Sequence, residues 1–459
     1  MKHTISSKIT LIIVLFLGLL SQAQSKKWTL EECVDYAIKN NISIKQSELD
    51  TKSASIEKSA AIGNFLPTFN INGSHSWNIG LNQNITTGLL ENQTTQFTSA
   101  GINSNIAIYN GMQNQNRLRR ANLAIVASEY QLSKMKDDIS LNVANAFLQI
   151  LFNKENLKVQ KEQLSNNEKQ LLRSQELVNA GVVPRGDLLD IKATVATNNQ
   201  AIVTAENALL ISKLSLAQLL QLDNFQDFDI ADANYDAKES STLLQTPAAI
   251  FAKAKEERVE LKIAKTNLEI AERDLKISKG AYQPSLHGFY SLSTRAGYSD
   301  RIVGIDGTGN PILAPALPVF KQFDNNKGHS FGFQMNIPVL NGFSVRNNVD
   351  RSKIALDRSK IAFSQQELDL ERNVYTAFTN AKGAMKANES AIITLEARQE
   401  AYNYAKEKFA VGMLNAFDLN QSETLFVNAQ SEVVRTKYDY IFRVKVIEFY
   451  FGIPIIKKQ

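Results

Sequence analysis

The chain has 459 residues, of which only 21 are glycine and 9 are proline, and 21% are charged. Its formal net charge of +5 is small and lies partly in the first ten residues. The only tight basic cluster, Arg117, Arg119 and Arg120, gives little support to nucleic-acid binding.

The N-terminus predicts export. Lys2 and Lys8 precede an apolar run from Ile9 to Leu20, and Ser21-Gln22-Ala23 offers small residues for cleavage. This pattern is typical of a secretory signal peptide, here residues 1–23, so the mature chain is expected to begin near Gln24. No later apolar run reaches the ~20 residues of a membrane-spanning helix. The single cysteine, Cys33, has no partner for an intrachain disulfide and is expected to pack as a small apolar residue.

Four segments alternate apolar and polar residues with the period of two that indicates β-strands: residues 68–79, 102–108, 286–293 and 331–339. The residues expected on the lipid-facing side are Phe69, Ile71, Trp77, Phe331, Phe333, Met335 and Ile337, with Val339 at the end of the last segment. A water-washed soluble sheet would alternate in the same way. The opposite face carries uncharged Asn, Ser and Gln residues. Together with export, that face favours strands placed between lipid and a lumen.

Four strands leave two unpaired edges, which a bilayer does not tolerate, so the strands are expected to be pooled among identical subunits. The second pair of strands has the longer connection, around Gly304 to Phe320 with three prolines. We expect this loop to be the exposed outer one. Its apolar stretch, residues 311–320, has the alternative of packing as a lid.

Residues 112–180 contain neither glycine nor proline, and as one helix they would extend ~100 Å. A seven-residue repeat predicts a coiled-coil seam at Val143, Ile150, Leu157, Leu164, Leu171 and Val178. The equivalent positions of the second half are less regular: Val374, Ala381, Asn388, Leu395, Tyr402 and Phe409. Gly383 is expected to interrupt that helix, which predicts a looser second seam. Segments 31–62 and 187–222 together match the long helix, so two short helices are expected to stack end to end beside it.

Matching residues recur 231 positions apart in the two halves of the chain. The pairs include Tyr109-Asn110-Gly111 with Leu340-Asn341-Gly342, Gly181 with Gly412, and Asp187 with Asp418. Because each half carries strands, a long helix, a glycine-centred break and a second helix, we interpret the pattern as an internal two-fold repeat. Residues 24–222 form the first copy, 223–254 an equatorial linker and 255–459 the second copy.

These features resemble the TolC family of outer-membrane efflux proteins. The resemblance covers essentially the whole mature chain and rests on motifs in a fixed order. They are Trp28-Thr29-Leu30-Glu31-Glu32, Phe65-Leu66-Pro67, the Tyr109-Asn110-Gly111 turn, and two tip motifs at residues 180–189 and 411–419.

The resemblance implies a mixed α and β membrane protein: a trimeric twelve-stranded β-barrel, with four strands per chain, continued by a long α-helical coiled-coil periplasmic barrel. It implies an outer-membrane exit duct of a tripartite efflux or type I secretion system in a Gram-negative bacterium. Such a duct conducts passively and takes substrates from a periplasmic adaptor protein and an inner-membrane transporter. No cofactor is implied.

The resemblance also assigns roles to the two tips. Adaptor docking falls on Gly181, Val182, Val183, Pro184, Gly412, Met413 and Leu414, and the periplasmic gate falls on Asp418 and Gln421. Members close the tunnel with carboxylates of the second tip. Asp418 matches the first acidic position, whereas Gln421 replaces the second, so a double acidic ring is not expected. The local alternative is that Gly181 and Gly412 simply end helices, while Asp187 and Asp418 cap a helix or favour its dipole.

The sequence offers no candidate catalytic residues. The histidines lie in the signal peptide or in strand segments and lack the spacing of a metal site or of a nucleophile and base. The chain is therefore not expected to be an enzyme. The alternative function is a structural or adhesive coiled-coil protein of the envelope, which would explain the heptads but not the strands or the tip motifs.

Overall fold

The computed structural model describes residues 27–84, 88–232 and 240–454. The predicted signal peptide lies outside the described residues, as do residues 233–239 of the predicted linker. The chain forms two compact units. Unit 1 contains the described parts of Met1–Asp50, Glu129–Ile263 and Ser364–Gln459, and unit 2 contains those of Thr51–Ser128 and Ala264–Phe363. Each unit therefore draws on both halves of the sequence, and the boundaries of the two predicted repeats remain a prediction.

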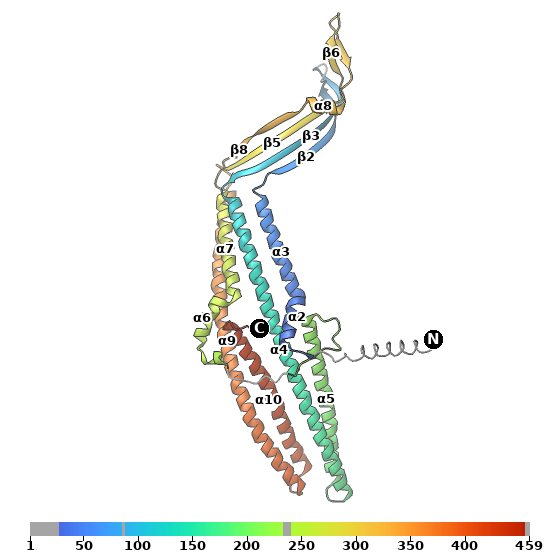
Figure 1. Cartoon of the computed structure of the whole chain (residues 1–459), viewed down its shortest axis with the longest axis vertical. Coiled ribbons are helices and arrows are strands. Elements are labelled where there is room, and N and C mark those ends of the chain that lie inside the picture. Colours follow the sequence, from blue (N-terminus) through green and yellow to red (C-terminus); the bar gives the residue numbers. More distant parts are fainter. Residues whose placement is uncertain (1–26, 85–87, 233–239, 455–459) are drawn as a thin grey trace, which may run out of the picture. The chain divides into compact units, whose positions relative to one another are not determined.

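Unit 2 is built on a four-stranded antiparallel sheet in the order β2-β3-β5-β8 (Figure 1). The strands are β2 (Thr68–Gln83), β3 (Leu90–Asn110), β5 (Ser285–Gly297) and β8 (Gly328–Asn336). β2, β3 and β5 each contain one of the four segments with period-two alternation, and β8 overlaps the fourth, so the prediction of four strands is correct.

The last strand begins and ends three residues earlier than predicted. β8 ends at Asn336, and Ile337 and Val339 lie beyond it. Pro338 has no N–H to donate to the ladder and restricts the residue before it, which explains the end of the pairing.

The long loop after β5 is ordered into a hairpin and a short helix. The hairpin pairs β6 (Arg301–Ile305) with β7 (Pro311–Ala314), and α8 (Val319–Asn325) follows. Gln322 fastens α8 to β5 because its amide donates to the Gly297 carbonyl at 2.8 Å and accepts from the Gly297 N–H at 2.9 Å. Phe320 on the same helix is 86% exposed. Ile312 and Leu313 in the apolar stretch are also exposed, so α8 contacts the sheet through a residue beyond that stretch, and the outer position of the loop stays a prediction.

Two helices of 67 residues each follow the two pairs of strands: α4 (Gln113–Asn179) and α9 (Ser344–Ala410). α9 runs without a break through Gly383, so the predicted interruption is wrong. One glycine costs a helix only about 1 kcal/mol, and Ala381 and Ala384 beside it are buried. The second seam is not looser in burial: Val374 and Ala381 are as enclosed as Val143 and Ile150. No helix among the described residues is both long and apolar enough to cross a membrane.

The short helices are interrupted where the sequence predicted one continuous segment. α2 (Leu30–Asn40) and α3 (Ile42–Gly63) are separated at Asn41, whose backbone is extended. The Asn41 amide donates to the Leu219 carbonyl at 2.9 Å and accepts from the Ser43 N–H at 2.9 Å. Asn41 therefore joins this junction to the end of α5 (Arg185–Leu220), and the end-to-end stacking of the two short segments stays a prediction.

A similar break separates α6 (Pro247–Glu257) from α7 (Val259–Gly280) at Arg258. The Arg258 side chain is 6% exposed and forms an ion pair with Glu260 at 2.9 Å. Its guanidinium also lies 3.7 Å from the ring centre of Phe449, near the end of α10 (Ala416–Tyr450). The cation is thus paired and stacked on an aromatic ring, which offsets the cost of burying it.

The largest apolar core of unit 1 surrounds the middle of α4. Val143, Phe147 and Ile150 are fully buried against Leu216 and Leu220 of α5. Cys33 of α2 belongs to this core with no exposed surface, as predicted, and burial raises the pKa of its thiol to about 12.

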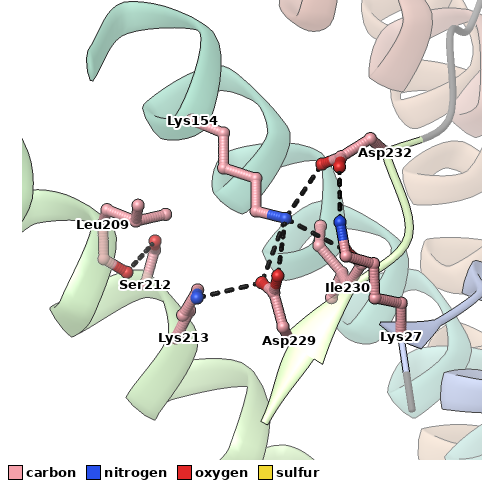
Figure 2. Close-up of polar contacts among 8 residues, drawn as sticks. All are labelled: Lys27, Lys154, Leu209, Ser212, Lys213, Asp229, Ile230 and Asp232. Carbon is pink, nitrogen blue, oxygen red and sulfur yellow. Dashed lines mark hydrogen bonds and ion pairs between the residues drawn. The ribbon is translucent and has the colours of Figure 1, made fainter. Parts of the chain in front are cut away.

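An ionic network holds the polar segment after α5 (Figure 2). β4 (Asp229–Ile230) pairs with β1 (Lys27–Trp28), and Lys154 of α4 reaches Asp229 at 3.0 Å and Asp232 at 2.9 Å. Lys213 binds Asp229 at 2.9 Å. Burial alone would raise the pKa of Asp229, but hydrogen bonds from the two lysines outweigh it and hold that pKa below its usual value. These contacts fix the segment to α4 and α5.

The turn after β3 yields a testable prediction. Gly111 has φ +67°, and a Cβ there would overlap the carbonyl oxygen of Gly280. Gly111→Ala is expected to lower the free energy of unfolding by ~1–3 kcal/mol through backbone strain and by a further ~1–3 kcal/mol through overpacking. Urea unfolding of the purified protein in detergent measures this loss. Gly342→Ala is the matched control, because Gly342 has φ +59° but no atom within 4 Å of its added Cβ. Equal losses at the two glycines would contradict the close approach to Gly280.

Candidate functional site

The first tip is a tight turn between α4 and α5. Gly181 has φ +73°, its N–H donates to the Val178 carbonyl at 3.0 Å, and the Val182 N–H donates to the Leu177 carbonyl at 2.9 Å. These bonds satisfy the last carbonyls of α4 and turn the chain through a left-handed glycine. The prediction that this glycine ends a helix is confirmed.

The second tip repeats this geometry between α9 and α10. Gly412 has φ +78°, its N–H donates to the Phe409 carbonyl at 3.1 Å, and the Met413 N–H donates to Lys408 at 2.8 Å. The helix-ending role of this glycine is confirmed as well.

Neither tip aspartate is the N-cap of its helix. Asn415 caps α10 by accepting from the Asp418 N–H at 2.8 Å, and its amide donates to the Asp418 carboxylate at 3.0 Å. Asp187 lies in the first turn of α5, whose N-cap is Pro184. Both carboxylates therefore sit where they favour the helix dipole. Asp418 is solvent exposed, and Asp187 is half-buried.

Gln421 lies in a groove between α5 and α10 within unit 1. The groove has a volume of about 440 Å³ and also contains Asp190 and Thr194 of α5 and Phe417 and Leu425 of α10. The structure thus brings the predicted gate residue Gln421 beside Asp190, a carboxylate that the sequence analysis did not single out.

Several apolar side chains at the tips face solvent in the single chain. Val182 is 67% exposed and Met413 is 72% exposed, whereas Val183 and Leu414 are half-buried. Phe417, at the start of α10, is 68% exposed.

A buried polar cluster connects four helices near the tips. Glu423 of α10 is 4% exposed and accepts from the Tyr402 hydroxyl of α9 at 3.2 Å. The Asn167 amide of α4, oriented to satisfy its neighbours, donates to both Glu423 oxygens at 2.7 and 3.0 Å. The Asn167 oxygen then accepts from Gln163 and from Asn198 of α5.

The Glu423 carboxyl has no ion pair among the described residues. Burial raises its pKa, and the hydrogen bonds from Gln163 and Tyr402, with the more distant charge of Lys406, offset this only in part. Burial and the Glu423 charge likewise raise the pKa of the Tyr402 hydroxyl. Glu423 was not predicted from the sequence. Its spacing from Ala416 and Leu419, which are also buried, was the available indication that it occupies an inward-facing helix position.

The two faces of the sheet differ sharply in chemistry. The register aligns Ile71, Ile102 and Leu292 on one face, and Asn70, Asn103 and Ser291 on the other. On the polar face the Asn103 amide donates to Asn72 at 2.8 Å and accepts from the Ser291 hydroxyl at 2.8 Å.

The predicted lipid-facing side chains are exposed in the single chain. They are Phe69, Ile71, Trp77, Phe331, Phe333, Met335 and Ile337, each more than half exposed. A face of hydrogen-bonded Asn and Ser side chains, opposite an apolar face that no described residue covers, matches the pattern of strands between lipid and water.

Comparison with known proteins identifies the family. The sequence model for outer membrane efflux proteins matches residues 33–221 and 227–446. The chain belongs to the outer membrane efflux protein family. It is 21% identical over 372 residues to the outer membrane protein TolC of Vibrio cholerae serotype O1, covering 79% of each chain. It is 22% identical over 347 residues to the pyoverdine export outer membrane protein OpmQ of Pseudomonas aeruginosa, covering 76% of this chain and 68% of that one.

Solved structures share the fold. VceC from Vibrio cholerae superimposes with a TM-score of 0.76 at 12% identity, over 92% of this chain and 96% of that one. The open state of the Neisseria gonorrhoeae MtrE outer membrane channel gives a TM-score of 0.70 at 15% identity, over 94% and 91% of the two chains.

Family membership confirms the predicted resemblance, function and location. The protein is an outer-membrane exit duct for efflux systems in a Gram-negative bacterium, with a periplasmic tunnel. The similar proteins are channel or export proteins rather than enzymes. The alternative of a structural or adhesive envelope protein gains no support.

The buried cluster predicts an unusual pH dependence. The folded-state pKa of Glu423 is raised, so its stabilising contribution is present below the unfolded value, near 4.5, and is lost as the pH rises through the folded value. Glu423→Gln removes this titration. We expect the variant to have a higher Tm than wild type at pH 7.5 and a smaller advantage at pH 5, measured by circular dichroism in detergent.

Glu432→Gln is the control on the same helix. A hydrogen bond from Arg435 lowers the pKa of Glu432, so its contribution is present above the unfolded value and is lost on acidification. The Glu432→Gln variant should have a lower Tm than wild type at pH 7.5. If Glu423→Gln also has a lower Tm than wild type at pH 7.5, the idea that the Glu423 carboxyl is buried without a counter-charge is wrong.

Proposed function

We propose that three copies of this chain form one duct, in which each copy contributes four strands to a closed twelve-stranded barrel. The observation that carries this proposal is the sheet itself, with one apolar and one polar face and with β2 and β8 each paired along one edge only among the described residues. Closing the sheet with copies of itself pairs both edges and turns every apolar face toward lipid.

Heptad stripes on the helices support assembly. Ile42, Leu49 and Ile56 follow one another at seven-residue spacing on α3, and all are more than 60% exposed. On α9 the same spacing joins Ile354, Ile361, Leu368 and Tyr375, which are 43–70% exposed. Apolar seams of this kind are typical of helices that pack against another helix. Neighbouring copies are the proposed partners, so the helices form a coiled-coil barrel in the periplasm.

The tips are the proposed docking surface for a periplasmic adaptor. Val182 and Met413 expose apolar surface at turns whose backbone is already satisfied. Gly181, Val183, Pro184, Gly412 and Leu414 complete this surface. The adaptor connects the duct to an inner-membrane transporter that supplies the energy, so the duct itself is passive and performs no catalysis.

The proposed gate combines Asp418 and Gln421. Both are exposed at the start of α10. Threefold symmetry would bring three Asp418 carboxylates toward one axis, where like charges in a narrow opening attract cations and repel anions. We also retain the proposal that residues 24–222 and 255–459 are two copies of one unit joined by 223–254.

Conductance tests the function directly. Purified mature protein in planar bilayers is expected to give discrete channel openings. Protein that inserts into bilayers but never conducts would contradict a duct.

The assigned faces of β8 generate a prediction. Phe333 pairs with Gly288 and Gln334 with His287, so the two side chains point to opposite faces. A charge facing the middle of the bilayer costs about 2–4 kcal/mol. Phe333→Arg should therefore reduce the yield of folded assembly in membranes, measured by heat-modified gel mobility, while Gln334→Arg should insert normally. Equal yields would refute the assignment of the lipid face.

The gate generates a second prediction. Asp418→Asn keeps the size of the side chain and its contact with Asn415 but removes the charge. We expect it to reduce cation selectivity, and Asp418→Arg to reverse it, with both effects weaker at high salt. Reversal potentials under a salt gradient measure this. The same changes at Asp187 should leave selectivity nearly unchanged; if only Asp187 variants shift it, the assignment of the gate is wrong.

A further inference from the structure

A pocket of about 590 Å³ lies where the end of the sheet meets the long loop after β5. Its walls come from Phe97 of β3, Arg295 of β5, Arg301 and Ile302 of β6, Leu317 and α8. None of these residues belongs to the gate, the tips or the predicted lipid-facing set.

The pocket is built on fixed backbone. Gln322 of α8 donates to the carbonyls of Gly297 at 2.8 Å and Leu317 at 2.7 Å. The Asn326 amide donates to the Arg295 carbonyl at 2.7 Å. Because these bonds join α8 to the end of β5, this side of the pocket is held in shape before any ligand binds.

Two arginines, Arg295 and Arg301, line the pocket, and neither forms an ion pair with any residue that the structure describes. The Arg295 guanidinium lies 3.7 Å from the ring centre of Phe97, so one of its faces is stacked. Stacking leaves the N–H groups in the guanidinium plane able to bind an anion in a bidentate fashion. Asp300 also lines the pocket, so the two arginines exceed it by one positive charge.

Part of the remaining wall is apolar, and the rest consists of polar side chains such as Gln322 and Asn326. Phe97, Ile302 and Leu317 offer ring and aliphatic surface beside the two cations. We propose that this pocket binds amphiphilic anions, with a carboxylate, sulfonate or phosphate group on Arg295 and Arg301 and an aromatic or aliphatic body against the apolar wall.

The register puts the pocket on the polar face of the sheet. Arg295 pairs with Ser99, which in turn pairs with Ser74, whose hydroxyl is 2.7 Å from that of Ser99. The proposed binding site depends only on the geometry of the pocket. Its location at the exit of the lumen rests on the proposed function.

The test uses the full mature protein in nanodiscs of zwitterionic lipid, with 1-naphthalenesulfonate as the probe and empty nanodiscs subtracted. Isothermal titration calorimetry should show one saturable site per chain, and 1-naphthalenemethanol, the uncharged analogue, should bind at least about tenfold more weakly. Inorganic phosphate should displace the probe only at much higher concentration, because it lacks the apolar body. Equal binding of the two naphthalene probes, or displacement by phosphate at equal concentration, would overturn the proposal.

Variants locate the site. Replacing both Arg295→Gln and Arg301→Gln should weaken probe binding by about tenfold or more. The control Lys327→Gln removes a cation that pairs with Asp324 outside the pocket and should change binding less than twofold. Phe97→Leu, which removes the stacking face, provides a second variant if the double substitution fails to fold. Unchanged affinity in a folded Arg295→Gln, Arg301→Gln or Phe97→Leu variant would contradict the assigned site, whatever the conductance of the duct.

Discussion

The two open edges of the β2-β3-β5-β8 sheet are the constraint on which the rest of this protein depends. An edge strand carries a row of N–H and C=O groups, and in a bilayer each unsatisfied group costs several kcal/mol. The chain has no described strand left to cover them, since β6 and β7 pair only with each other. The apolar face adds a second demand, because no described residue covers Phe331 and Phe333. Both demands are met when copies close the sheet in lipid.

The helical part of the chain solves a different problem. An apolar core around Phe147 and Leu216 gives way toward the tips to polar contacts such as those of Glu423, Tyr402 and Asn167. An apolar core stabilises strongly and is insensitive to pH, whereas buried polar contacts respond to protonation and to the loss of one partner. The arrangement therefore combines an apolar middle with ends whose packing responds to a change in charge. That difference is compatible with the proposed gate at the tips.

Local chemistry explains which parts of this fold were predictable from sequence. The strands were predictable from the alternation of apolar and polar residues, which reflects which side chains face one environment. The helix α4 was predictable from the absence of glycine and proline. The tip glycines were likewise predictable, since a left-handed residue is needed there. The breaks at Asn41 and Arg258 were not, because each depends on a partner distant in sequence, the Leu219 carbonyl or the Phe449 ring. Glu423 and the Arg295 pocket depend in the same way on tertiary neighbours. The break predicted at Gly383 is an error of the opposite kind. The buried residues beside Gly383 outweigh the low helix propensity of one glycine.

The most direct test of this account is the number of chains in the purified particle. Light scattering corrected for bound detergent, applied to the mature protein extracted from outer membranes, should give three chains per particle, since three four-stranded sheets pair every edge in a barrel of twelve strands. A single chain that inserts and conducts in planar bilayers would contradict it, because such a chain would have to tolerate the open edges of β2 and β8 in lipid.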